Sequence, residues 1–141
     1  MIAVLAGGVG AARFLRGAVR LNAPLTAIVN TADDTVLHGL HISPDLDTVM
    51  YTVVGAIDPE RGWGLANESW NAMEALARFE SVTPADSLAA PRWFNLGDRD
   101  LATHFYRTAR LREGASLTEV TTEIAEAWDA GGAYLVGRFS S

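Results

Sequence analysis

The sequence predicts an α/β protein in which helices flank a parallel sheet, and three observations support this fold class. The apolar run Ile2–Ala6 is typical of a short buried strand. Apolar residues then recur at helical spacing over residues 11–19. A second apolar run, Leu25–Val29, follows a turn that contains Pro24. A strand, a helix and a strand in this order form a βαβ unit, which requires a parallel sheet and a right-handed crossover.

The composition limits the class of protein. The chain has 141 residues, enough for a single domain over residues 1–141, and it has no cysteine, which excludes disulfides and thiolate metal sites. The net charge of −6 argues against a general nucleic-acid or membrane-surface binder. All 11 basic residues are arginine, so Schiff-base and P-loop lysines are excluded. Because the sequence has neither a membrane-length apolar segment nor a signal-peptide pattern, we expect a soluble cytoplasmic protein.

A glycine-rich loop lies between the first strand and the first helix. Gly7, Gly8 and Gly10 let backbone N–H groups approach an anion, and the positive end of the following helix points to the same place. The loop lacks the third glycine of the dinucleotide fingerprint. Two interpretations remain open, a phosphate-binding loop and a tight βα turn that binds nothing.

Polar residues follow the second strand and begin the next helix. Residues 30–34 lie at the carboxyl end of a strand, where open α/β sheets bind ligands, although Asn, Thr and Asp also form ordinary turns. Ser43 and Pro44 predict a helix start, with Asp45 and Asp47 in its first turn. The helix dipole favours acids there, but two carboxylates beside a phosphate loop are also what Mg²⁺ binding needs.

The middle of the chain predicts another helix and a third strand. Residues 67–79 have a helical pattern, and residues 80–91 form a looser connection. Residues 93–96 predict a strand, and residues 97–100, Gly-Asp-Arg-Asp, follow it at once, so the opening arrangement is repeated. The apolar face of the predicted helix contains Trp70, Met73, Leu76 and Ala77.

The last third of the chain predicts two more helices. The first has Phe105 on its apolar face, while His104 and Arg107 lie near one another beside the preceding loop. Residues 116–119 form a capping box that starts the second helix. Residues 133–139 read as a last strand.

Four polar clusters therefore lie at strand ends or helix starts: residues 7–10, 30–34, 45–47 and 97–100. In a doubly wound sheet such clusters meet at one edge. Their predicted convergence favours a phosphate or nucleotide site, but it does not name a reaction.

Five motifs carry a resemblance to a known family: AGGVGAARFLRG (6–17), VNTADD (29–34), LHGLHISPDLDTVMYT (37–52), GWG (62–64) and NLGDRDLATHFYRTARLREGASLTEVT (95–121). Together they resemble the 2-phospho-L-lactate transferase family of coenzyme F-420 biosynthesis, whose actinobacterial members are called phosphoenolpyruvate transferases. The resemblance runs from Met1 to about Trp128 and implies a Rossmann-like fold. It also implies transfer of a phospholactyl or phosphoenolpyruvyl group from a guanosine-diphosphate-activated donor to the terminal ribityl hydroxyl of the deazaflavin Fo, with Mg²⁺ assisting and GMP leaving.

The resemblance also implies roles for individual residues. The diphosphate of the donor would face Gly7, Gly8 and Gly10. The candidate catalytic residues and Mg²⁺ ligands are Asp45 and Asp47; Asp47 is the better candidate for contact with Fo and for accepting the proton of its hydroxyl. Fo would also contact Arg99. The same edge of the sheet would be lined by Asn30, Asp33 and Asp34.

Family members are considerably longer than this chain, so the resemblance implies an apparently truncated fold with a divergent tail over residues 129–141. A parallel sheet cut in this way leaves an unpaired edge, from which we expect poor stability or a homodimer. Alternatives to an active transferase are a non-catalytic module that binds Fo or nucleotide, and an inactive fragment. The motifs SPDLDT and LGDRD favour the transferase lineage over a related group of regulatory proteins.

Overall fold

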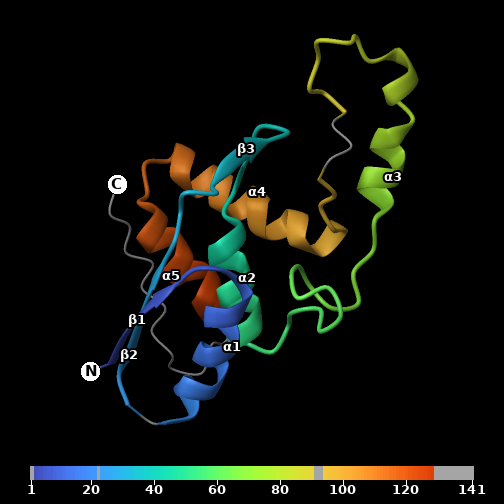
Figure 1. The fold of residues 1–141 in the computed structure, drawn as a ribbon. Helices are drawn as coiled ribbons and strands as arrows, with labels where there is room; N and C mark the ends of the chain where they lie inside the picture. The colour runs from blue at the N-terminus through green and yellow to red at the C-terminus, as the bar shows by residue number, and fades with distance from the viewer. Residues whose placement is uncertain (1, 22, 91–93, 129–141) are drawn as a thin grey trace.

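The computed structural model describes residues 2–21, 23–90 and 94–128. Strands β1 (Ile2–Ala6) and β2 (Leu25–Val29) pair in parallel, with Ile2 opposite Leu25 and Ala6 opposite Val29. Helix α1 (Gly8–Ala18) and the short 3₁₀ helix η1 (Val19–Leu21) connect them. The predicted βαβ unit and the α/β fold class are confirmed (Figure 1).

A β-hairpin that the sequence analysis did not predict follows β2. Strands β3 (Thr35–Leu37) and β4 (Leu40–Ile42) are antiparallel. The turn residues His38 and Gly39 both have positive φ, 54° and 72°. Positive φ at both central positions is typical of a type I′ turn, which matches the twist of a hairpin. Asn-Gly is the usual sequence signal for this turn. This chain has His-Gly at the two positions, so the sequence did not indicate a hairpin.

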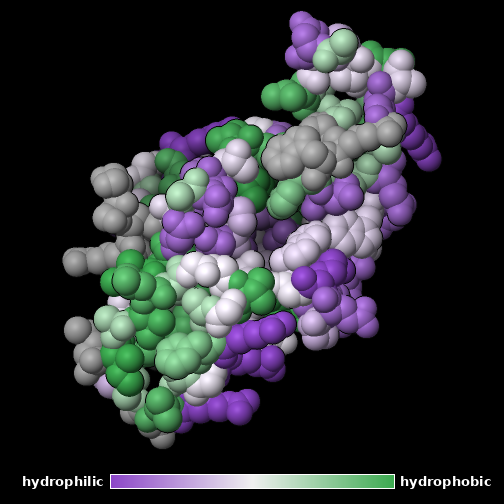
Figure 2. All heavy atoms as spheres, viewed as in Figure 1, coloured by the Kyte–Doolittle hydropathy of each residue, from purple (hydrophilic) through white to green (hydrophobic). Residues whose placement is uncertain are grey.

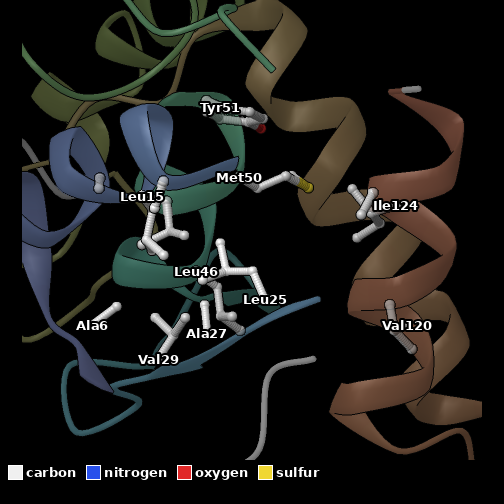
Figure 3. Close-up of a cluster of buried hydrophobic side chains, with 14 of the residues drawn as sticks. Ala6, Leu15, Leu25, Ala27, Val29, Leu46, Met50, Tyr51, Val120 and Ile124 are labelled. Carbon is white, nitrogen blue, oxygen red and sulfur yellow. The ribbon is translucent and has the colours of Figure 1, made fainter. Parts of the chain in front are cut away.

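Helix α2 (Pro44–Val53) lies at the centre of the molecule (Figure 1). Every residue of its middle part, from Leu46 to Thr52, is buried. The main core cluster joins α2 to the βαβ unit and to the last helix (Figure 3). The labelled members are Ala6, Leu15, Leu25, Ala27, Val29, Leu46, Met50, Tyr51, Val120 and Ile124.

The helix predicted over residues 67–79 is shorter than expected. Helix α3 covers Asn71–Ala77 and is followed by the 3₁₀ helix η2 (Glu80–Val82). Asn67 has a left-handed backbone with a φ of 54°, so the helix cannot begin there. No residue of α3 is buried, in contrast to the predicted apolar face. This segment projects away from the rest of the structure (Figure 1).

Helices α4 (Asp98–Arg112) and α5 (Leu117–Ala127) complete the described structure. The predicted capping box is present, since the Ser116 hydroxyl accepts from the Glu119 N–H and the Glu119 carboxylate accepts from the Ser116 N–H. The prediction of a third strand is wrong for residues 94–96, which join no sheet in the described part of the chain. Leu96 instead packs with Leu37 and Ile42 of the hairpin. Trp93, residues 133–139 and the divergent tail lie outside the described residues.

Apolar side chains also reach the surface around the βαβ unit. Figure 2 shows a largely hydrophobic region there. Leu5, Phe14 and Leu21 are 80%, 61% and 66% exposed, respectively. No helix in residues 2–21, 23–90 and 94–128 has the length and apolar character needed to cross a membrane.

The packing of α1 can be tested by a pair of neighbouring substitutions. Leu15 is fully buried in the main core, whereas the adjacent Phe14 is 61% exposed. We expect Leu15→Ala to lower the free energy of unfolding by about 2–5 kcal/mol, because it leaves a cavity. Phe14→Ala should change it by no more than about 0.5 kcal/mol. Urea denaturation followed by circular dichroism measures both, and equal losses would contradict this assignment of the core.

Candidate functional site

The glycine loop forms the N-terminus of α1 directly after β1. Gly7 is the N-cap residue, and Gly8 has a φ of 77°, which a residue with a Cβ rarely adopts. Methyl groups placed on Gly8 or Gly10 would meet no described atom within 4 Å. No described side chain therefore fills the space beside these two glycines.

Asn30 connects this loop to the start of α2. Its backbone N–H donates to the Ala6 carbonyl at 2.9 Å, and a methyl group on Gly7 would lie 3.8 Å from its Cβ. Its side-chain nitrogen donates to Asp45 at 2.8 Å and to Asp33 at 3.4 Å. The structure thus brings together four predicted site positions at the carboxyl edge of the two strands: Gly7, Asn30, Asp33 and Asp45.

Asp34 points to a different set of partners. One of its carboxylate oxygens accepts from the Ser43 hydroxyl at 2.8 Å and lies 3.4 Å from the His41 ring. Its other oxygen is buried without a hydrogen-bond partner among the described residues. These contacts make Asp34 a link between the β3–β4 hairpin and the beginning of α2.

Asp47 forms a buried ion pair with Arg107 of α4. The two residues are 6% and 1% exposed, and the guanidinium reaches both carboxylate oxygens, with Nη2 on Oδ1 and Nη1 at 3.2 Å from Oδ2. Burial raises the pKa of Asp47 above the ordinary carboxyl value, and the attraction of Arg107 opposes this shift. Asp45 and Asp47 therefore have different partners, although they are only two residues apart.

A hydrogen-bond network extends from this ion pair. Arg107 Nη1 donates to His104 Nδ1 at 3.3 Å, which leaves the ring proton on Nε2, 3.1 Å from the Asp100 carboxylate. The Tyr51 hydroxyl donates to the other oxygen of Asp100 at 2.6 Å. Burial would raise the pKa of Asp100, but the hydrogen bonds from His104 and Tyr51, together with the electrostatic attraction of the His104 and Arg107 side chains, outweigh it and lower the pKa.

Asp47, Asp100 and His104 also have the spacing of a metal site. One ligand atom from each lies within 4.8 Å of the others, and within the described ranges this is the only such group of three His, Cys, Asp or Glu residues. Both carboxylates already accept strong hydrogen bonds, and the Arg107 cation lies against Asp47 and His104. The candidate ligand atoms are thus already engaged, so the arrangement fits a hydrogen-bond network better than a metal centre.

The network borders a pocket of about 200 Å³. Its polar lining contains Asp47, Asp100 and His104, and two aromatic residues, Trp63 and Phe94, contribute to its apolar lining. The GWG motif includes Trp63, but sequence reasoning gave it no role. The remaining lining residues are Ile42, Pro44, Thr48, Tyr51 and Gly64.

The N-terminus of α4 is capped by a carboxylate of the chain itself. Glu68 accepts from the Arg99 N–H at 2.8 Å and from the Asp100 N–H at 3.0 Å. A Cβ on Gly97 would overlap with the Glu68 side chain, so glycine is required for this close approach. The second glycine loop therefore does not repeat the open arrangement of the first. The exposed Arg99 guanidinium donates to the Ala66 carbonyl at 3.1 Å.

Asp98 in turn caps the N-terminus of α3. Its carboxylate accepts from the Ser69 hydroxyl at 2.8 Å and from the Asn71 and Ala72 N–H groups, both at 2.9 Å. Together, Glu68 and Asp98 fasten the start of α3 to the start of α4. The contacts of Glu68 with α4 and of Asp98 with α3 join residues that are distant in sequence, so no local sequence pattern predicts them.

Comparisons with known proteins identify the family of the chain. A family model described as 2-phospho-L-lactate transferase CofD matches residues 2–135. The chain belongs to this family. A phosphoenolpyruvate transferase of Mycobacterium ulcerans is 49% identical over 147 residues, covering 95% of this chain and 42% of the relative. One of Nocardia farcinica is 52% identical over 132 residues, covering 92% and 37%. The chain thus spans about two fifths of the length of these curated relatives.

The Asp47–Arg107 pair predicts a large loss of stability when only one partner is removed. We expect Arg107→Met to cost about 3–5 kcal/mol of unfolding free energy, because Asp47 is left buried and unpaired. The double variant Asp47→Leu/Arg107→Met removes both charges and should recover a large part of that loss. Urea denaturation of the parent, the single variant and the double variant gives the three free energies of unfolding to be compared. A single variant as stable as the parent would show that the pair is not desolvated.

The Asp98 cap predicts acid sensitivity at the start of α3. Hydrogen bonds to the carboxylate, first from the Ala72 N–H and then from the Ser69 hydroxyl, lower the pKa of Asp98 from the ordinary 3.8 to about 2. A lowered pKa stabilises the folded state above pH 3.8, and this contribution is lost as the pH falls toward 2. The protection factors of the Asn71 and Ala72 amides, which correct for the intrinsic pH dependence of hydrogen exchange, should therefore fall in that interval. Asp98→Asn should remove this dependence, whereas the exposed control Asp86→Asn should retain it.

Proposed function

We propose that this chain provides the part of the sheet edge that binds the donor, and part of the acceptor site, of a Mg²⁺-dependent transferase of coenzyme F-420 biosynthesis. The reaction moves a phosphoenolpyruvyl or phospholactyl group from a guanosine-diphosphate-activated donor to Fo and releases GMP. Membership of the CofD family supports this proposal. The observation that carries it in the structure is the meeting of Gly7, Asn30 and Asp45 at one edge of the sheet.

The donor diphosphate would lie against the loop of Gly7, Gly8 and Gly10, where the α1 N-terminus provides N–H groups and a positive dipole. Of the two Mg²⁺ ligands that the resemblance implies, Asp45 is retained, whereas Asp47 is already paired with Arg107. Asp33 would take its place, because an oxygen of Asp33 and an oxygen of Asp45 both approach the side-chain nitrogen of Asn30. Two carboxylates together with substrate phosphates are a common Mg²⁺ ligand set. When bound, Mg²⁺ supplies positive charge to the phosphoryl oxygens.

The acceptor would contact Asp47 and Arg99. The hydroxyl oxygen of Fo forms a bond to the phosphorus that carries the lactyl or enolpyruvyl group. The bond from that phosphorus to the bridging oxygen breaks, and GMP leaves with this oxygen. Asp47 lines the pocket and is held in one orientation by Arg107, which suits it to orient the hydroxyl and accept its proton.

A binding and turnover experiment tests this function. Fo fluorescence is titrated with the protein, and turnover is then measured with the guanylyl-activated donor, with and without Mg²⁺. Asp47→Ala and Arg99→Ala should each weaken Fo binding by about tenfold or more, as expected for lost bonds to charged groups. Arg78→Ala, an exposed arginine beyond α3, is the matched control and should bind as the parent does.

The outcomes separate the alternatives. Absence of Fo binding by folded protein would refute the proposed acceptor site. Binding without turnover would select a non-catalytic binding module. Because Asp47→Ala leaves Arg107 buried without its partner, circular dichroism must show native structure, and Asp47→Asn gives a second variant of nearly the same shape.

A further inference from the structure

We infer that Trp63 and Phe94 form a stacking wall for the planar ring of an aromatic ligand in the pocket. This inference rests on the proposed function only in taking a deazaflavin as that ligand. The two ring centroids are 6.4 Å apart and the ring planes differ by 26°, so the rings are nearly parallel. Both residues line the pocket, and Trp63 remains 40% exposed although it is large and apolar.

Arg61 holds Trp63 from outside the pocket lining. Its guanidinium carbon lies 5.1 Å from the centroid of the Trp63 ring and 5.2 Å from that of Trp70, within the range of cation–π contacts. The same guanidinium donates to the Leu65 carbonyl at 2.9 Å and pairs with Asp58 at 3.3 Å. Arg61 is therefore fixed at several points and acts as a positioning residue for Trp63.

The loop that carries Trp63 is closed by its own backbone. Asp58 N–H donates to the Gly64 carbonyl at 3.1 Å, and Gly62 N–H donates to the Asp58 carbonyl at 3.0 Å. The Asp58 side chain also accepts from the Arg61 N–H at 2.8 Å. A ring held in this way loses little conformational freedom when a ligand packs on it, which favours binding.

The wall lies between two other parts of the candidate site. A methyl group on Gly62 would be 3.7 Å from Val9 Cγ1, so the loop of Trp63 adjoins the glycine loop. Within the pocket, Trp63 and Phe94 share the lining with Asp47 and His104. An apolar aromatic surface with a few fixed polar groups suits a ring system that carries a polar chain.

Trp70 provides a matched control inside the same cluster. It contacts Arg61 at nearly the same distance as Trp63 does, but it is not part of the pocket lining. If the cluster only stabilised the loop, substitution of either tryptophan would have similar consequences. A stacking role makes ligand affinity depend on the Trp63 ring and not on Trp70, whose ring meets that of Trp63 at an angle of 71° and lies outside the lining.

The experiment uses the complete chain and two probes, Fo and the same deazaflavin ring with a methyl group in place of the ribityl chain. Binding is followed by ring fluorescence, and circular dichroism and thermal melting confirm folding. Trp63→Leu should weaken both probes by about tenfold or more, because stacking on the ring is lost. Trp63→Phe retains an aromatic ring and should stay within about threefold of the parent. Trp70→Leu should bind both probes as the parent does.

Each result has a distinct meaning. Equal affinity of Trp63→Leu and the parent for both probes overturns the stacking wall and leaves the proposed acceptor in place. Binding of neither probe by the folded parent overturns both proposals. Trp63-dependent binding of both probes with no Mg²⁺-dependent turnover supports the wall and overturns the proposed transferase activity. A loss of affinity in Trp70→Leu as large as that in Trp63→Leu, with native folding, overturns the wall in favour of a structural cluster.

Discussion

The ion pair between Asp47 and Arg107 is the constraint on which the candidate site depends. It joins α2 to α4 across 60 residues of sequence and is almost removed from water. Two charges in such a place are tolerated only when their geometry and their remaining hydrogen bonds are good. The bidentate contact meets this condition, and a second bond from Arg107 fixes the His104 ring. By holding α4 against α2, the pair also brings Asp100 to the pocket.

The parts of the fold that the sequence predicted are those determined by local patterns. The βαβ unit follows from two apolar runs on either side of a helical repeat, and its parallel pairing follows from its topology. The α5 capping box needs only Ser116 and Glu119, three residues apart. In the same way, Pro44 marks the beginning of α2 whatever surrounds it.

The parts that the sequence did not predict depend on contacts between distant residues. A helical repeat in α4 assigned Phe105 to the interior, but Phe105 is 56% exposed and the buried face contains His104 and Arg107. Polar side chains point inward there because Asp47 of another helix supplies the partner that burial requires. Likewise, Glu68, which precedes α3, caps α4, and Asp98 of α4 caps α3; these contacts span about 30 residues, which no spacing rule can anticipate. The same applies to Trp63, whose neighbours Arg61 and Trp70 are local but whose partner Phe94 is not.

The geometry of one helical turn determines what the two aspartates of the motif PDLD can contact. Residues two apart on a helix point in different directions, so Asp45 and Asp47 cannot act as one pair of neighbouring carboxylates. Asp45 faces Asn30 and the glycine loop, whereas Asp47 faces Arg107 and the pocket. Their backbone positions differ by only about 3 Å along the helix axis. The first turn of α2 is thus the junction between the proposed donor and acceptor sites.

Reaction between a hydroxyl and a phosphorus requires an approach of about 3–3.5 Å. A rigid, buried helix with one carboxylate directed to each proposed substrate site would hold that approach.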